Sequence, residues 1–282
     1  MKTFTIKEIT NTPLLTPAAK QWAIDNLHYL NKPMSLFGSS TKVEKGSDKF
    51  STYILYMQPA NKVSALTLCL GAESAGCLLG CLINSGLLGK TPGQNAATKR
   101  TILFLMRQEW FFAQLLKEID AAERKAKRTG IPALFRLNGT SDIDFSELIK
   151  QRPKSWFYDY SKLLARVSKN TLPNYDLTYS ASMYSKQSKA ALKKAVQRRL
   201  RIAVAYNTKE SRGETLRIPS EFISFDKTDL RHLDPKEIGT LKRKGSNKEE
   251  RHAENQKANS FFVTETNQEE FQQLIAVKQL AA

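Results

Sequence analysis

The sequence predicts an α/β protein built on parallel strands, arranged as a partial or complete (β/α) barrel. Two observations lead to this expectation. Short β-branched or aromatic runs alternate with helical patterns along most of the chain, which is typical of βαβ units. Polar residues gather directly after several of these runs, at the edge where parallel α/β folds carry their active sites. An open, doubly wound sheet is the alternative architecture.

The expected elements follow one another along the chain. A helical pattern covers residues 13–30, and one long helix is expected over residues 96–128. Strands are expected at residues 50–57, 64–68, 133–137, 155–160, 175–180, 201–206 and 222–225. Shorter helices are expected at residues 145–150, 163–168 and 185–199, and an amphipathic segment at residues 269–280.

Length and composition fit a globular protein with a sizeable core. The chain has 282 residues, of which 41% are hydrophobic and 25% charged. We expect an N-terminal extension (1–50), an α/β core (51–240) and a charged linker with a C-terminal segment (241–282). No apolar run is long enough for a transmembrane helix, and the N-terminus lacks signal-peptide features. Three cysteines cannot all pair with one another, so we expect reduced thiols and a cytoplasmic location.

All three cysteines, Cys69, Cys77 and Cys81, fall inside one glycine-rich stretch, residues 67–86. Seven residues separate the first pair and three the second, which would place Cys77 and Cys81 on one face of a helical turn. Three thiolates can hold a soft metal or an iron–sulfur cluster and leave one coordination position open. The alternatives are a structural metal such as zinc, or cysteines that are buried like small hydrophobic residues.

Three further candidates lie where predicted strands end. Asp142 follows the strand at 133–137 and is a candidate catalytic carboxylate, with a structural salt bridge as the alternative. Lys162 follows the strand at 155–160 and is a candidate substrate-phosphate contact or proton donor, with a solvated lysine as the alternative. Ser180 closes the strand at 175–180 and is a candidate cofactor contact.

The net charge of +17 and the sequence pI near 9.7 favour a polyanionic partner, of which nucleic acid is the commonest in a cell. The helix expected at 185–199 carries a basic stripe that includes Lys189, Lys193, Arg198 and Arg199, which could follow a nucleic-acid backbone. A solvated outer helix is the alternative. The sequence lacks a Gly-x-Ser-x-Gly elbow, a Walker loop and a dinucleotide-binding fingerprint, which argues against hydrolases, NTPases and dehydrogenases.

Several of these motifs together resemble the phage gene product 88 family, in order and rough spacing, from about residue 36 to residue 263. The motifs are Cys69…Cys77-x3-Cys81, Arg136-Leu-Asn-Gly-Thr-Ser-Asp142, Tyr158-Asp-Tyr-Ser-Lys162, Leu177-Thr-Tyr-Ser180, and Asp226…Asp229 with Leu233-Asp234-Pro235. The resemblance implies that the chain is phage-encoded, which would place it in the host cytoplasm.

The strand–loop pattern is in turn similar to partial barrels of the radical-SAM type. That similarity implies a [4Fe–4S] cluster on Cys69, Cys77 and Cys81 with one iron open to S-adenosylmethionine. It also implies that Asn138, Ser141 and Asp142 contact the polar groups of a bound cofactor. The seven-then-three cysteine spacing departs from the three-then-two spacing usual in radical-SAM proteins.

Two functions from different classes follow. The first is a cytoplasmic iron–sulfur enzyme that acts on a small-molecule or nucleic-acid substrate held by the strand-end loops. The second is a nucleic-acid-binding protein without enzymatic activity, used in phage replication, whose cysteines hold a structural metal or remain reduced.

Overall fold

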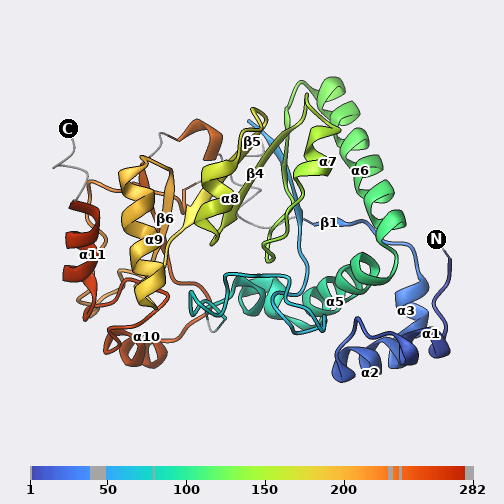
Figure 1. Cartoon of the computed structure of the whole chain (residues 1–282), viewed down its shortest axis with the longest axis horizontal. Coiled ribbons are helices and arrows are strands. Elements are labelled where there is room, and N and C mark those ends of the chain that lie inside the picture. The colour runs from blue at the N-terminus through green and yellow to red at the C-terminus, as the bar shows by residue number, and fades with distance from the viewer. Residues whose placement is uncertain (1, 39–48, 79, 228–230, 235–236, 277–282) are drawn as a thin grey trace. The chain divides into compact units, whose positions relative to one another are not determined.

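The computed structural model describes residues 2–38, 49–78, 80–227, 231–234 and 237–276 (Figure 1). The chain divides into two compact units, residues 1–69 with 85–157 and residues 70–84 with 158–282. The predicted three-part division at residues 50 and 240 stays a prediction. Within the described ranges, no helix has the length and apolar character needed to cross a membrane.

The first unit contains three short N-terminal helices, two long helices and the first strands. Its elements are α1 (Ile6–Asn11), α2 (Pro17–Asp25), α3 (Leu27–Asn31), β1 (Phe37–Gly38), β2 (Ser51–Leu55), α5 (Thr91–Met106), α6 (Gln108–Thr129), β3 (Ala133–Arg136) and α7 (Ser146–Lys150). Strand β4 (Trp156–Ser161) begins in this unit and ends in the second.

The second unit continues the alternation of strands and helices. Its elements are α8 (Leu164–Lys169), β5 (Tyr175–Ser180), α9 (Lys186–Gln197), β6 (Ile202–Tyr206), β7 (Ile223–Ser224), β8 (Ile238–Lys242), α10 (Lys248–Asn255) and α11 (Gln268–Ile275). Strand β8 and helix α10 were not expected from the sequence. The other strands of this unit lie within two residues of their predicted positions.

The strands form one mostly parallel sheet in the order β1-β2-β3-β4-β5-β6-β8-β7. The pairs β2–β3, β3–β4, β5–β6, β6–β8 and β7–β8 are parallel, and β1 is antiparallel to β2. The predicted α/β class with parallel strands is therefore confirmed. The sheet is open over the described residues, so the expectation of a complete barrel is wrong; a partial barrel stays a prediction. Both edge strands have only two residues, which is too short for a further ladder.

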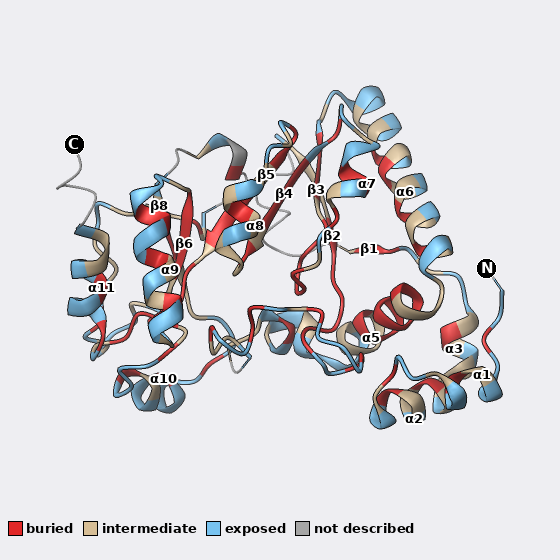
Figure 2. Cartoon of the chain, viewed as in Figure 1, coloured by how far each residue is buried: buried red, intermediate tan, exposed pale blue. Residues whose placement is uncertain are grey.

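The core of the first unit lies between β2, β3 and the long helices. Strand β2 pairs with β3 in the register Ser51–Ala133, and the middle of α5, residues 97–104, is buried (Figure 2). Helix α6 buries Phe111, Leu115 and Ile119, which are spaced four residues apart and so share one face. The sequence pattern predicted Leu115 and Ile119 on this face because its period is that of a helix, but it chose Phe112 where the structure buries Phe111.

The single long helix predicted over residues 96–128 is two helices that meet at Arg107. Arg107 has φ −140° and ψ 46°, outside the helical region. Its guanidinium donates to both carboxylate oxygens of Glu8, at 2.5 and 2.8 Å, and lies 4.2 Å from the ring centroid of Phe4. The break therefore depends on contacts with the N-terminal segment, which the local pattern does not contain.

The strand expected at residues 64–68 does not form. The described backbone there makes only a single antiparallel bridge, between Ser64 and Leu15. The amide of Ala65 donates to the carbonyl of Leu14 at 2.9 Å, so this segment pairs with the connection between α1 and α2 instead of with the sheet. Its β-branched and apolar residues satisfied the strand pattern, but tertiary pairing decided otherwise.

The core of the second unit is built on β6, β8 and the buried face of α9. Strand β6 pairs with β8 over five residues, from Ile202–Ile238 to Tyr206–Lys242. Helix α9 buries Leu192, Ala195 and Val196 and turns its basic residues outward, as an amphipathic outer helix does.

Candidate functional site at the carboxyl ends of the strands

In the first unit, Cys69 lies against the turn that follows β3. Its Sγ atom is 3.6 Å from the carbonyl oxygen of Thr140, and the amide of Asp142 donates to the carbonyl of Leu68 at 2.9 Å. The Thr140 hydroxyl in turn donates to the carbonyl of Met57, just beyond β2. The structure thus brings Cys69 to the Asn138–Asp142 turn, at the carboxyl ends of two neighbouring parallel strands.

The side chains of Asn138 and Ser141 hold this turn together. The Asn138 Oδ1 atom accepts from the Ser141 hydroxyl at 2.9 Å and from the Ile143 amide at 2.8 Å, while its Nδ2 donates to the Ile143 carbonyl. Asn138, Ser141 and Asp142 are all buried. The polar side-chain atoms of Asn138 and Ser141 are therefore engaged within the turn, and their hydrogen bonds hold it in one conformation.

In the second unit, residues 70–84 form the cysteine loop, which carries Cys77 and Cys81. This loop is tied to the start of α9. The Ser74 carbonyl accepts from the hydroxyls of Ser185 and Ser188 at 2.9 and 3.0 Å, and the Ala75 carbonyl accepts from Ser182 at 2.7 Å. The residues between the end of β5 and the first turn of α9 therefore anchor the loop.

The expected helical turn from Cys77 to Cys81 is wrong for the described residues. Gly76 has φ +62°, a left-handed conformation that ends the preceding turn, and a short 3-10 helix begins only at Leu82. A Cβ atom at Gly76 would lie 2.3 Å from the ring of Tyr184, so the backbone here needs glycine for its φ angle and for space. The described residues 77, 78, 80 and 81 do not form the helical turn that the spacing suggested, and residue 79 lies outside the described residues.

Lys162 and Ser180, predicted separately, meet in the structure. The Lys162 Nζ atom donates to the Ser180 hydroxyl at 2.8 Å and lies 4.2 Å from the ring centroid of Phe261. Lys162 follows β4 and Ser180 ends β5, so this contact joins the carboxyl ends of two strands. A Cβ atom at Gly71 would lie 2.8 Å from the Cβ of Lys162, which places the cysteine loop directly beside the lysine.

The three cysteines are half-buried thiols, so the expectation of fully buried, core-like cysteines is wrong. Each is followed directly by an exposed leucine: Leu70, Leu78 and Leu82 are 69%, 43% and 42% exposed. Single exposed leucines are common on protein surfaces, so the notable feature is their position directly after each cysteine. Among the described residues, no group of three or more His, Cys, Asp or Glu side chains is gathered as a metal would require.

The predicted nucleic-acid residues of α9 differ in their surroundings. Lys189 is half-buried and forms a 2.6 Å ion pair with Glu270 of α11. Lys193, Arg198 and Arg199 are exposed, and the Arg198 Nη1 atom donates to the Ser168 hydroxyl of α8 at 2.8 Å. Lys189 therefore helps to hold α11, while the other three residues share an open surface.

A model of the family described as Gene product 88 matches residues 32–260, which covers most of the chain. The chain belongs to the Gene product 88 family. A search of the curated proteins and a search of the solved structures each returned no significant match. In this Gene product 88 protein, the matched region contains the three cysteines, the Asn138–Asp142 turn, the Lys162–Ser180 contact and α9. Asp229 and Pro235 of the family motifs lie outside the described residues.

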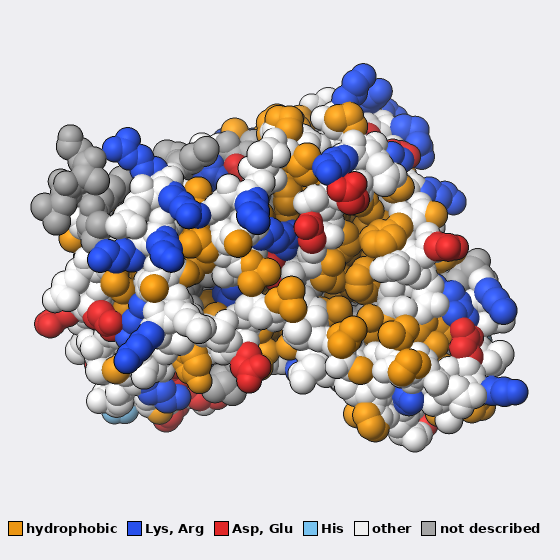
Figure 3. Space-filling view, in the orientation of Figure 1, with side chains coloured by type: hydrophobic (Ala, Val, Ile, Leu, Met, Phe, Trp, Pro, Cys, Tyr) orange, Lys and Arg blue, Asp and Glu red, His pale blue; other side chains and the backbone are white. Residues whose placement is uncertain are grey.

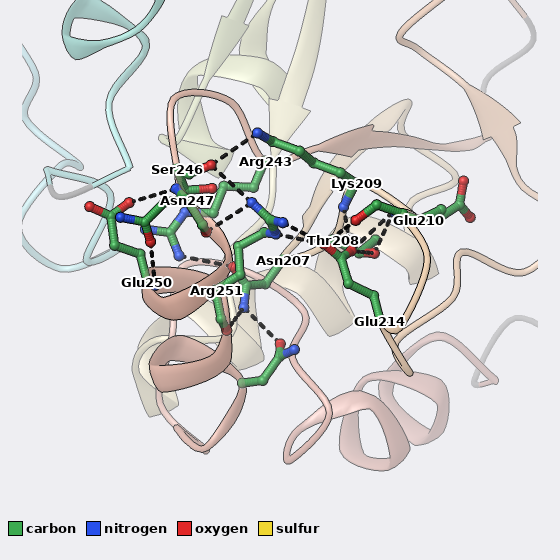
Figure 4. Close-up of polar contacts among 12 residues, drawn as sticks. Asn207, Thr208, Lys209, Glu210, Glu214, Arg243, Ser246, Asn247, Glu250 and Arg251 are labelled. Carbon is green, nitrogen blue, oxygen red and sulfur yellow. Dashed lines mark hydrogen bonds and ion pairs between the residues drawn. The ribbon is translucent and has the colours of Figure 1, made fainter.

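A second polar cluster, which sequence reasoning missed, occupies the carboxyl end of β6 in this Gene product 88 protein (Figure 4). Residues 207–216 form the glutamate loop, named for the carboxylate at its centre. One Glu214 oxygen accepts from the Thr208 hydroxyl at 2.6 Å and from the amides of Lys209 and Glu210. The other accepts from the Ser211 hydroxyl and from two nitrogens of Arg251, at 2.9 and 2.6 Å.

The charge of Glu214 is held by these donors. Burial raises the pKa of Glu214, but the hydrogen bonds from Thr208, Ser211, the Lys209 amide and Arg251 outweigh it and hold the pKa well below its ordinary value. Arg251 also donates to the carbonyls of Ser246 and Asn247. The cluster therefore attaches α10 to the end of β6.

The sequence contained a signal for helix α10, but it contained none for the pairing of Arg251 in that helix with Glu214. Asn247 and Glu250 form a capping box at the start of α10, a pattern that a search for helix N-termini can find. The Arg251–Glu214 pair spans 37 residues, and no local spacing connects them.

Proposed function

We propose that this Gene product 88 protein is an iron–sulfur protein in which Cys69, Cys77 and Cys81 bind a [4Fe–4S] cluster, and that it is an enzyme whose substrate lies at the carboxyl ends of the strands. One observation carries the proposal: three half-buried thiols, each followed by an exposed leucine, on segments packed against strand-end loops. We place the activity in the cytoplasm of the phage's host.

The chemistry of the donor set favours a soft metal centre. Thiolates are the ligands of iron–sulfur clusters, and three of them leave one iron for exchange chemistry. Cysteines that ligate or react are partly accessible, whereas inert structural cysteines are buried. Apolar side chains beside the sulfurs control solvent access to a cluster and thereby tune it. In this chain the leucines that directly follow the cysteines would limit solvent access to the cluster; they are Leu70, Leu78 and Leu82.

Binding has to assemble the ligand set, because the described residues do not present three ligating side chains together. Metal affinity and local ordering are coupled in proteins, since a site that is absent before binding is formed at the expense of binding free energy. The glycines at positions 71, 76 and 80 each lie close against a neighbouring side chain, so this closure has to move those contacts.

The chain's own polar residues take the remaining roles. Lys162, held by Ser180 and Phe261, binds an anionic group of the substrate or donates a proton to it. Asp142, on the rigid turn beside Cys69, is the candidate carboxylate for proton transfer. Asn138 and Ser141 act by fixing that turn. Radical chemistry with S-adenosylmethionine at the open iron is the narrower form of the proposal, tested by binding of S-adenosylmethionine to the cluster-loaded protein.

Anaerobic purification tests the cluster directly. We expect a brown protein with broad absorbance near roughly 400 nm and about four irons and four sulfides per chain. Cys69→Ser, Cys77→Ser and Cys81→Ser should each lose most of the iron. Glu73→Gln removes the only carboxylate between residues 67 and 86 and should retain it, which makes it the matched control.

Two results would overturn the proposal. One is a stoichiometric zinc ion that the serine variants lose, which would assign the cysteines to a structural metal. The other is protein that holds no iron after anaerobic reconstitution, with unchanged folding of the serine variants.

A further inference from the structure

Helices α8 and α9 together expose a basic surface, defined here by Lys169, Lys193, Lys194, Arg198 and Arg199. All five side chains are exposed, and Figure 3 shows Lys and Arg side chains gathered over these two helices. Neither helix contains an Asp or a Glu, so their own residues do not neutralise the surface. The surface does not involve the cysteines.

The solvent side of α9 and one hydrogen bond to α8 organise this surface. On α9, Lys193 and Lys194 lie opposite the buried residues Leu192, Ala195 and Val196, on the solvent side of the helix. The hydrogen bond from Arg198 to Ser168 fixes the Arg198 guanidinium at the end of α8, beside Lys169, the last residue of that helix. This hydrogen bond therefore joins the two helix ends that carry the basic side chains.

The backbone at Arg199 gives an independent indication of function. Arg199 has φ +53°, and it ends α9 in a Schellman motif: its amide donates to Val196, and the Leu200 amide donates to Ala195. Glycine is the residue that this position favours, because an L-residue is strained there. Helix α6 follows that preference and ends at Gly130, with φ +72°. Arginine at a position that favours glycine motivates the hypothesis that its side chain serves a purpose other than stability.

Cations interact favourably with helix C-termini, and this interaction explains part of the clustering of basic residues at the ends of α8 and α9. It accounts for Lys194 in the last turn of α9, and for Lys169 in the last turn of α8. It does not by itself require arginine at position 199, because Arg198 already places a cation at the end of the helix.

We propose that the α8–α9 basic surface binds the phosphate backbone of nucleic acid, without sequence readout, and that Arg199 is one of its phosphate contacts. Arginine and lysine on one face release counterions when they neutralise phosphates, which is the main source of affinity in non-specific binding. The overall charge of +17 favours the encounter. This interaction is separate from the cluster proposal and does not depend on it.

The test is fluorescence anisotropy with labelled single-stranded and double-stranded oligonucleotides, titrated with salt, together with thermal unfolding. Arg199→Gly should raise the unfolding temperature and weaken binding roughly fivefold to tenfold at about 0.1 M salt, with a fall of about one in the salt slope. Arg199→Lys should keep the affinity. Lys193→Gln with Lys194→Gln should weaken binding further.

Lys117→Gln is the matched control, because Lys117 is an exposed lysine of α6 and its loss changes the net charge by the same amount. Three results would overturn the proposal. These are no binding of either oligonucleotide at about 50 mM salt, equal weakening by Lys117→Gln, or an Arg199→Gly variant that is more stable yet binds as tightly as the parent. Repeating the titration with all three cysteines changed to serine keeps this result separate from the presence of a cluster.

Discussion

Two loops of the second unit stand in clear contrast: the cysteine loop (70–84) and the glutamate loop (207–216). In the glutamate loop, hydroxyls, amides and an arginine all converge on one buried carboxylate, Glu214 (Figure 4). The cysteine loop is anchored through its backbone carbonyls at Ser74 and Ala75. Its own side chains, the thiols and the leucines beside them, stay partly exposed.

This contrast separates structural from functional chemistry. A buried charge that is fully hydrogen-bonded stabilises the fold, because its removal would leave partners without compensation. Exposed apolar side chains, such as the leucines that follow the three cysteines, contribute little to stability. We therefore assign the glutamate loop to architecture and the cysteine loop to function, and three changes test that assignment.

The largest expected effect is that of Arg251→Met. The variant keeps the apolar stem but leaves Glu214 as a buried charge without its arginine, so unfolding in urea should show a loss of about 3–5 kcal/mol. Lys257→Met, which breaks the exposed ion pair to Glu254 in the same region, should cost about 0–1 kcal/mol. Equal losses in the two variants would mean that the glutamate loop is not held by this pair.

The second test compares a glycine from each loop. Gly76 and Gly213 both have positive φ, at +62° and +83°, so alanine should cost about 1–2 kcal/mol at either position. Only at Gly76 would the new Cβ also meet a ring, that of Tyr184, which should add about 1–3 kcal/mol. Thermal unfolding of Gly76→Ala and Gly213→Ala measures the difference. If Gly213→Ala proves the costlier change, the close packing of the cysteine loop is contradicted.

The smallest effect is a dependence on pH. The folded-state pKa of Glu214 lies below its ordinary value near 4.5, so its contribution to the free energy of unfolding is present above that value and is lost as the pH falls below it. Urea midpoints measured between pH 7 and about pH 3 should therefore fall less steeply for Glu214→Gln than for the parent. Other carboxylates titrate in both proteins, so the difference between the two slopes reports Glu214. Parallel curves would refute its role.

Much of the fold could be predicted because its signals are local. The strand at 175–180 and the buried face of α6 depend on periods of two and of about four residues, which the sequence displays directly. The break at Arg107 and the missing strand at 64–68 depend on contacts with the N-terminal segment, so no local window contains them.

The candidate site divides in the same way. Residue type and position after a strand were enough to select Cys69, Lys162 and Ser180 as candidates. The contact between Lys162 and Ser180 depends on the pairing order of the strands. The sequence suggested this contact only because both residues follow parallel strands, whose carboxyl ends share one edge of the sheet. Glu214 and Arg251 were missed because a partner 37 residues away leaves no periodic trace.

By itself, the sequence determined the α/β class, the positions of most strands and the gathering of every thiol into one glycine-rich stretch, because these follow from composition and from short-range backbone preferences. Only the tertiary structure decided that the sheet stays open, that the thiols remain half-exposed and that Glu214 and Arg251 are paired. Burial and long-range hydrogen bonding are properties of the assembled chain, and they choose among local conformations of nearly equal free energy.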